Sequence, residues 1–320
     1  MPAFHVYKPA DAYLVNGSSE LNAPPEDFTG ANPFRGVNPA NGIVLYYQLP
    51  ELAKTDDITL EIADASGRVV RTLTSKKDTS FKRWDGGPPA PATLPKSKGL
   101  NRFVWDMRHN TMPGVPGVYI EANYRGHKAS PGKYRITMKQ GAQTATTEAT
   151  ILANPLYTTD AATYAEYDAF MSEMERELSR MHETVNTLTD VQNQLKAVAA
   201  ALPSDEKHAS ARRDADSLMT RLKAWDTDMV SRRSRAYDDV ENFEQKFTAH
   251  YMFLINATES ELPRVNQPSR DRRVQLDADW TRLKARSDAM INADIPALSR
   301  KLWDLGLGAL WKIPTPRIVP

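Results

Sequence analysis

The feature that most constrains this chain is a row of apolar side chains between Tyr164 and Leu202, spaced alternately three and four residues apart. This spacing places the row on one stripe of an α-helix for more than five heptads, a pattern typical of helices that pack side by side. At about 1.5 Å per residue, the predicted helix is roughly 60 Å long. Only Gln192 interrupts the apolar character of the row. The members are Tyr164, Tyr167, Met171, Met174, Leu178, Met181, Val185, Leu188, Gln192, Leu195, Ala199 and Leu202.

Glycine and proline divide the chain into two halves. Thirteen of the 15 glycines lie between Gly17 and Gly141, and none occurs from residue 142 to residue 305. Fifteen of the 22 prolines fall within the first 155 residues. Because both residue types break helices and favour turns, the first half is predicted to be rich in turns and the second half helical. The length of 320 residues suggests about two domains in an α+β chain.

Short strands are predicted throughout the first half, because β-branched, aromatic and alternating apolar residues recur between turn signals. The predicted strands and hairpins cover residues 42–50, 57–74, 99–106 and 131–152. This succession indicates an antiparallel β-sandwich of the immunoglobulin-like or fibronectin-III-like type over residues 1–155. The stretches 75–98 and 109–130 are predicted to be long loops on the surface.

A second helix follows the first after a short break. Pro203 ends the first helix, and Ser204–Glu206 are predicted to supply the N-cap and the acidic first turn of the second. From Ala211 to Met229 the apolar residues repeat the spacing of four and three.

The remaining sequence completes a predicted bundle. Residues 236–256 have a helical composition, and Ser269 is predicted to cap a last helix whose apolar row runs to Leu298. Long helices joined by short connections pack as antiparallel neighbours, so three or four helices are expected over residues 156–302. The prolines of residues 303–320 predict an extended tail.

Composition excludes several classes of protein and site. The chain has no cysteine, so it forms neither a disulfide nor a cysteine-ligated metal site. The 41 basic and 40 acidic residues give a net charge of +1, which argues against nucleic acid as the partner. The longest apolar runs are far shorter than the about 20 residues of a membrane span, so no transmembrane segment is predicted. The first eight residues lack the pattern of a signal peptide, which leaves a processed end and a cytosolic start both open.

Motifs for catalysis are incomplete. His182 and Glu183 begin an H-E-x-x-H zinc motif, but Asn186 stands where the second histidine is required. We therefore expect His182 to be a solvated helix histidine. Four Trp-Asp pairs lie 21, 120 and 78 residues apart, which does not match the repeat of about 40–45 residues in a WD propeller. The sequence predicts no enzymatic activity and no catalytic, metal-binding or cofactor-binding residue.

Basic and aromatic residues make up the predicted interaction surface. Three arginines between positions 232 and 235 form a basic cluster that suits phosphates or lipid headgroups, which would be a peripheral membrane contact. A solvated helix face is the alternative, because acidic residues lie nearby. The aromatic-rich stretches 251–255 and 303–311 are expected in the core or, if exposed, at an interface. The candidate interaction residues are Trp84, Arg232, Arg233, Arg235 and Trp311.

The order of the strand motifs resembles that of a known family. Gly42–Tyr47 precedes the hairpin Ile58–Arg71, and Gly99–Arg108, Pro131–Tyr134 and the long helices follow. This order is similar to the C-terminal region of large bacterial sortilin-like, BNR-repeat "glycosyl hydrolase" proteins, in which an Ig-like strand domain and a helical segment follow β-propellers. The hairpin and the strand after it also resemble the Ig-like domain of flagellar hook-capping proteins.

The resemblance implies an exported bacterial accessory module. This chain has neither the propellers nor the Asp-box repeat of that family, so no catalytic residue carries over. We expect a non-catalytic binding or scaffold subunit, periplasmic or extracellular, that docks through its loops and helices onto a larger protein assembly. A membrane-anchored photosynthetic or secretion assembly is the kind of host implied.

Two alternatives remain open. The chain would serve carbohydrate metabolism, as an enzyme or as its accessory module, if a pocket held two carboxylates about 5–10 Å apart. It would be a carbohydrate- or peptide-binding module if Trp84 and Trp105 formed an exposed platform.

Overall fold

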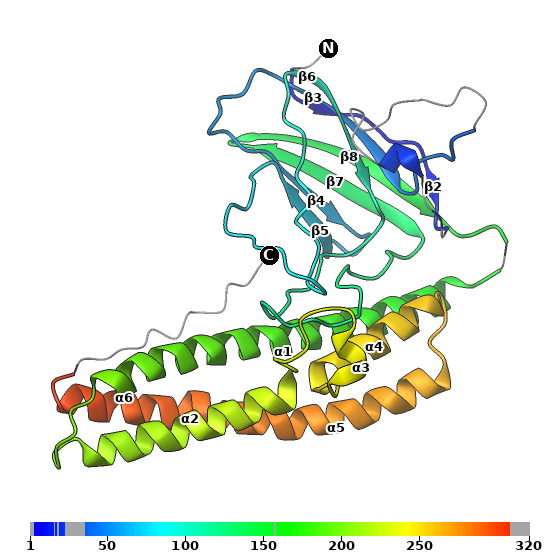
Figure 1. Cartoon of the computed structure of the whole chain (residues 1–320). Helices are drawn as coiled ribbons and strands as arrows, with labels where there is room; N and C mark the ends of the chain where they lie inside the picture. Colours follow the sequence, from blue (N-terminus) through cyan, green and yellow to red (C-terminus); the bar gives the residue numbers. More distant parts are fainter. Residues whose placement is uncertain (1–2, 16, 18, 23–35, 157, 308–320) are drawn as a thin grey trace.

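A computed structural model describes residues 3–15, 17, 19–22, 36–156 and 158–307 (Figure 1). The architecture is mixed α+β, with strands in the first half and long helices in the second. We call the described residues up to 156 the β region and those from 158 the helical region. Figure 1 shows the β region resting on one side of the helices. Within the described residues, no helix has both the length and the apolar character needed to cross a membrane.

Within the described residues, eight strands form two sheets. They are β1 (His5–Val6), β2 (Ala12–Tyr13), β3 (Ile43–Leu49), β4 (Thr59–Ala63), β5 (Val69–Thr74), β6 (Gly99–Trp105), β7 (Gly132–Gln140) and β8 (Gln143–Leu152), described alongside a 3₁₀ turn, η1 (Glu20–Asn22). One sheet has the order β1-β3-β6 and is antiparallel. The other has the order β2-β8-β7-β4-β5, antiparallel except for the parallel β2–β8 pair. The strands predicted from sequence are confirmed, whereas β1 and β2 are too short to show a period.

The two sheets share one core. Along β3, Ile43, Leu45 and Tyr47 are fully buried, while the intervening Tyr46 is 42% exposed. The same alternation buries Ile136 of β7 and its neighbours two positions away. Residues from both sheets belong to a single apolar cluster, so period-two patterning directs one side of each sheet into a shared core.

Residues 158–307 of the structure contain six α-helices and a π-helical segment. They are α1 (Ala161–Ala201), α2 (Ala209–Met229), α3 (Asp239–Asn242), α4 (Phe247–Ser260), α5 (Gln267–Ala289), η3 (Met290–Asp294, the π segment) and α6 (Ile295–Asp304). α1 packs against α2 and α4, α4 against α5, and α2 against α6. The last predicted helix is therefore α5, η3 and α6 in succession. The π segment comes just before Pro296, which lacks the N–H that would continue an α-helical ladder.

The long apolar row of α1 is buried, with one change of phase. Every predicted member from Tyr164 to Leu188 is buried. Beyond Leu188, Leu195 and Leu202 are buried as predicted, but Val191 and Val198 are buried in place of Gln192 and Ala199, which are partly exposed. A helix of 3.6 residues per turn drifts relative to a 3.5-residue repeat. The shift of one position keeps a polar side chain at the edge of the core.

Two predicted helix caps are wrong by a few residues. α2 begins later than expected, and Asp205 accepts a hydrogen bond from the His208 N–H at 3.0 Å instead of starting the helix. α5 is capped by Asn266, whose side-chain oxygen accepts from the Ser269 N–H at 2.8 Å. Asparagine and serine are both good N-cap residues, so residue type alone did not distinguish them.

The stretch 109–130 is not the surface loop predicted from sequence. Its apolar side chains lie in the core of the helical region: Met112, Val115, Val118, Ile120 and Tyr124. The Met112 N–H donates to the Tyr124 carbonyl at 2.8 Å, which satisfies part of the buried backbone. These apolar residues follow neither the strand nor the helix period, so no pattern signals their burial. The domain boundary near residue 155 stays a prediction.

Truncation of Met112 should therefore destabilise the helices. Met112 is 2% exposed, and Met112→Ala is expected to cost about 2–5 kcal/mol through lost contacts and a cavity. Val274→Ala on α5 is the control, because Val274 is 71% exposed and should change stability by about 0.5 kcal/mol or less. Urea unfolding followed by the helical circular dichroism signal measures both. Equal midpoints would show that the loop is not part of the helical core.

Candidate functional site

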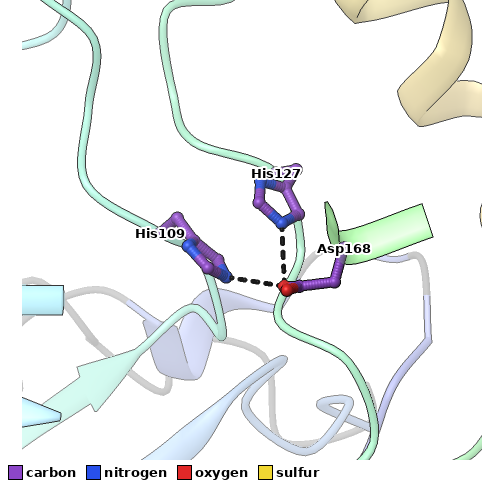
Figure 2. A group of neighbouring side chains, drawn as sticks. All are labelled: His109, His127 and Asp168. Atoms are coloured by element: carbon purple, nitrogen blue, oxygen red, sulfur yellow. Dashed lines mark hydrogen bonds and ion pairs between the residues drawn. The ribbon is translucent and has the colours of Figure 1, made fainter. Parts of the chain in front are cut away.

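A cluster of ionisable side chains lies where the loop 109–130 meets α1. His109 and His127 come from the two ends of the loop, and Asp168 comes from the second turn of α1 (Figure 2). The Asp168 Oδ1 atom lies 3.3 Å from His109 Nε2 and 3.2 Å from His127 Nε2. Figure 2 shows both rings aimed at this one carboxylate oxygen. We call these three residues the His–His–Asp cluster.

His127 is enclosed by two carboxylates of α1. Its side chain is fully buried, and its Nδ1 lies 3.0 Å from Glu175 Oε2. Its backbone N–H donates to Glu175 Oε1 at 2.6 Å. Glu175 lies seven residues after Asp168, two helical turns along the same face. The two carboxylates therefore contact the two different nitrogens of the ring.

Asp168 is also held by the β region. Arg68, at the start of the β4–β5 return, pairs with Asp168 Oδ2 at 2.5 Å, and its Nε pairs with Asp64 at 2.9 Å. The Arg68 Nη1 donates to Ser172 Oγ on α1 at 3.1 Å. The two oxygens of Asp168 thus have different neighbours, with Arg68 on Oδ2 and the two histidines on Oδ1.

The surroundings shift each pKa in a direction set by burial and charge. Burial alone would lower the pKa of His127, but the charges of Glu175 and Asp168 and their hydrogen bonds raise it to about 9. Burial alone would raise the pKa of Asp168, but the nearby His109, His127 and Arg68 hold it far below its usual range. Burial lowers the pKa of His109, the opposite direction to that of His127.

His109 has the least satisfied group of the cluster. Its ring stacks on His127, with centroids 3.9 Å apart and planes 22° apart. Its side chain is 12% exposed, and its Nε2 is buried without a well-formed hydrogen bond despite the nearby carboxylate. Two imidazole nitrogens and one carboxylate oxygen therefore converge, a donor set that divalent transition metals accept.

Sequence reasoning missed this cluster. His109 and His127 are 18 residues apart in a loop, and Asp168 is a further 41 residues along the chain. None of these separations matches a metal-binding or catalytic spacing motif. The only available signal was the presence of two histidines in one stretch rich in glycine and proline.

The arginines of the predicted basic cluster at positions 232–235 make separate contacts within the chain. Arg232 forms two hydrogen bonds with the Asp226 carboxylate, at 2.7 and 3.0 Å, and one with Thr189 at 2.7 Å. The guanidinium of Arg233 lies over the Phe243 ring, 4.0 Å from its centroid. Arg232 and Arg233 are therefore occupied within the chain, and whether they contact a partner stays a prediction.

The other candidate residues lie apart from that cluster. Arg235 is exposed, and its backbone N–H donates to Asp239 at 2.7 Å. Trp84 is partly buried, and its indole N–H donates to the Val118 carbonyl at 3.0 Å. Trp311 lies outside the described residues.

The alternatives based on carbohydrate binding gain no support from the described residues. Trp105 is 1% exposed and donates to the Arg108 carbonyl, so it offers no face to a sugar. Two grooves lie on the β region, of about 600 Å³ beside Tyr13 and about 830 Å³ along β6. Each has a single carboxylate in its lining, Asp11 in the first and Asp106 in the second. Neither groove supplies the carboxylate pair that glycoside hydrolysis needs.

His182 fastens the loop 109–130 to α1 from within the core. The ring is fully buried, and its Nδ1 lies 2.7 Å from the Pro113 carbonyl oxygen, so it acts as the donor. The amide of Asn186, one turn further on, donates to the Gly114 carbonyl at 3.0 Å. The expectation of a solvated helix histidine is therefore wrong, because the loop covers this face of α1.

Comparisons with protein-family models, with curated protein sequences and with solved structures found no match to this chain. The similarity to the sortilin-like proteins therefore stays a prediction, and no role is transferred to any residue from a relative.

Loss of Glu175 should destabilise the chain strongly. Glu175→Ala leaves a buried, charged His127 and its backbone N–H without their partner, which is expected to cost about 3–5 kcal/mol. Glu173→Ala on the same helix is the control: its carboxylate is 51% exposed and pairs with Arg273, so about 1 kcal/mol or less is expected. Chemical denaturation compares the two variants. Similar losses would contradict the paired state of His127.

His182 should make stability depend on pH in mildly acidic solution. Burial lowers its pKa to about 4, whereas the unfolded chain titrates near 6.5. Its contribution is therefore present above about pH 6.5 and is lost as the pH falls towards 4. His182→Gln keeps a donor for the Pro113 carbonyl and removes the titration. Its stability should fall less steeply than that of the wild type, by up to about 1.4 kcal/mol per pH unit in this window. Parallel curves would refute this account.

Proposed function

We propose that this chain is a non-catalytic binding or scaffold subunit that docks, outside the cytoplasm, onto a larger membrane-associated protein assembly. The observation that supports this most is the exposure of Phe253 on α4. Phe253 is 71% exposed, while Tyr251, Met252, Leu254 and Ile255 around it are buried. A helix that is apolar on all sides normally has protein on all sides, so the open face of α4 suits a protein partner.

A second exposed apolar side chain lies at about the same distance from the α4–α5 turn as Phe253. Val274 of α5 is 71% exposed. Phe253 is seven residues before the end of α4, and Val274 is seven residues after the start of α5, so both lie about 10 Å from the turn between the helices. A hydrogen bond of 3.0 Å between Tyr251 and Asp277 joins α4 to α5 near this level. We call Phe253 and Val274 the α4–α5 patch.

Firm attachment of the two regions suits a scaffold. The His–His–Asp cluster and a pair of Arg108 with Glu259 at 2.5 Å join the β region to α1 and α4. Trp303 of α6, 64% exposed, adds a separate apolar contact point far along the helices. We further propose that the two sheets are an Ig-like or fibronectin-III-like sandwich and that the long helices are an antiparallel bundle. The apolar cluster shared by the two sheets and the packing of α1 against α2 and α4 support these assignments.

The α4–α5 patch can be tested by recovery of the native assembly. Membranes of the source organism, solubilised gently, are separated by size, and the fraction containing the chain is measured. Phe253→Glu with Val274→Ser should shift the chain from the large assembly to the monomer fraction, because charge at an apolar interface is unpaired and desolvated. Cross-linking before solubilisation shows whether the same neighbour is lost.

Leu156→Ser is the matched control, because Leu156 is 88% exposed and belongs to the connection between β8 and α1, not to α4 or α5. It should leave recovery unchanged. The proposal is overturned if the wild-type chain always fractionates alone. If it fractionates with an assembly and the double variant does so equally, the α4–α5 patch is not the docking face.

A further inference from the structure

We propose that His109, His127 and Asp168 bind a divalent transition-metal ion of the Zn²⁺ class, which joins the loop 109–130 to α1. The ligand atoms are Nε2 of both histidines and Oδ1 of the aspartate. All three lie within 4.8 Å of one another. The inference is independent of the proposed function, since it concerns the junction inside the chain and not the docking face.

The spacing of the ligand atoms suits a tetrahedral ion. Zn²⁺ binds nitrogen and carboxylate oxygen at about 2.0–2.2 Å, so two ligands of one tetrahedron lie roughly 3.3–3.5 Å apart. The two distances from Asp168 Oδ1, 3.3 Å to His109 and 3.2 Å to His127, are close to this separation. The aspartate and one ring from each end of the loop therefore require only small movements to share an ion.

Glu175 orients His127 as an outer ligand sphere would. Metal-binding histidines almost always donate their second ring N–H to a carboxylate or carbonyl, which fixes the tautomer. The contact of His127 Nδ1 with Glu175 at 3.0 Å supplies this arrangement and leaves Nε2 facing Asp168. Arg68 holds Oδ2 of the aspartate in a similar way, so that Oδ1 is the oxygen left for the ion.

The state of His109 is the second observation that points to a ligand. Its Nε2 is buried and lacks a well-formed hydrogen bond, a costly condition for a polar atom. A metal ion at the point of convergence would satisfy this nitrogen, and it would replace the contact of His127 Nε2 with Asp168.

Charge and donor type select the class of ion. Once an ion displaces the Nε2 proton of His127, both rings are neutral, and Asp168 and Glu175 carry two negative charges against the one positive charge of Arg68, so the pocket offsets part of the charge of the cation. Imidazole nitrogens favour Zn²⁺ and its neighbours over Mg²⁺ and Ca²⁺, which prefer all-oxygen sites. Three protein ligands leave a fourth position for water or for a group from outside the chain.

Metal titration of the full chain tests the site. Chelator-treated protein is titrated with Zn²⁺ by calorimetry and with Co²⁺ by visible absorption. The wild type should bind one ion per chain, show the intense absorption of a four-coordinate Co²⁺ site, and unfold at a higher temperature with Zn²⁺ than with chelator. His109→Ala and Asp168→Asn should lose the saturable site. Glu175→Gln should weaken binding by about 10–100-fold while the Co²⁺ spectrum remains.

Two controls keep the test decisive. His250→Ala removes an exposed histidine of α4 that lies outside the cluster, and it should bind as the wild type does. His109→Ala removes a ring whose Nε2 makes no well-formed hydrogen bond, so this variant should remain folded by circular dichroism. The proposal is overturned if the wild type binds no Zn²⁺, or if His109→Ala and Asp168→Asn bind it as tightly as the wild type.

Discussion

The pairing of the His127 ring with Asp168 and Glu175 determines how the sheets are seated on the helices. Both carboxylates belong to one face of α1, whereas the ring belongs to a loop that begins after β6 and ends at β7. A charged ring cannot leave two buried carboxylates without a large desolvation cost. The loop is therefore fixed to the helix, and the two strands at its ends are fixed with it.

The apolar part of the same loop makes the attachment deeper than an ion pair alone. Its side chains from Met112 to Tyr124 lie within the helical core, and His182 and Asn186 bind its backbone carbonyls from the facing turns of α1. The polar contacts fix the position of the loop along α1. The apolar contacts exclude water from these hydrogen bonds, which strengthens each of them. The β and helical regions consequently present their outer faces in a constant relative orientation, as a scaffold requires.

Much of the fold follows from periodicity, and almost none of the candidate site does. The buried row of α1 and the alternation along β3 are local patterns, because each residue's burial follows from its place in a helix or strand. His109, His127 and Asp168 meet only because an irregular loop lies across a helix, and irregular backbone has no sequence period. Phe253 shows the opposite difficulty: it lies within an apolar run, and only packing decides that it alone is exposed.

One helix belongs to both cores. Tyr164, in the first turn of α1, packs among the residues of the two sheets, whereas Tyr167 and the side chains after it pack among the helices. Only the first turn of α1 thus packs with the sheets, and the rest of the helix extends through the helical region. For a helix of roughly 60 Å, a tilt of about 5° at the anchored end moves the far end by about 5 Å. The contacts of the sheets with this end of α1 therefore fix the position of the far end of the helix.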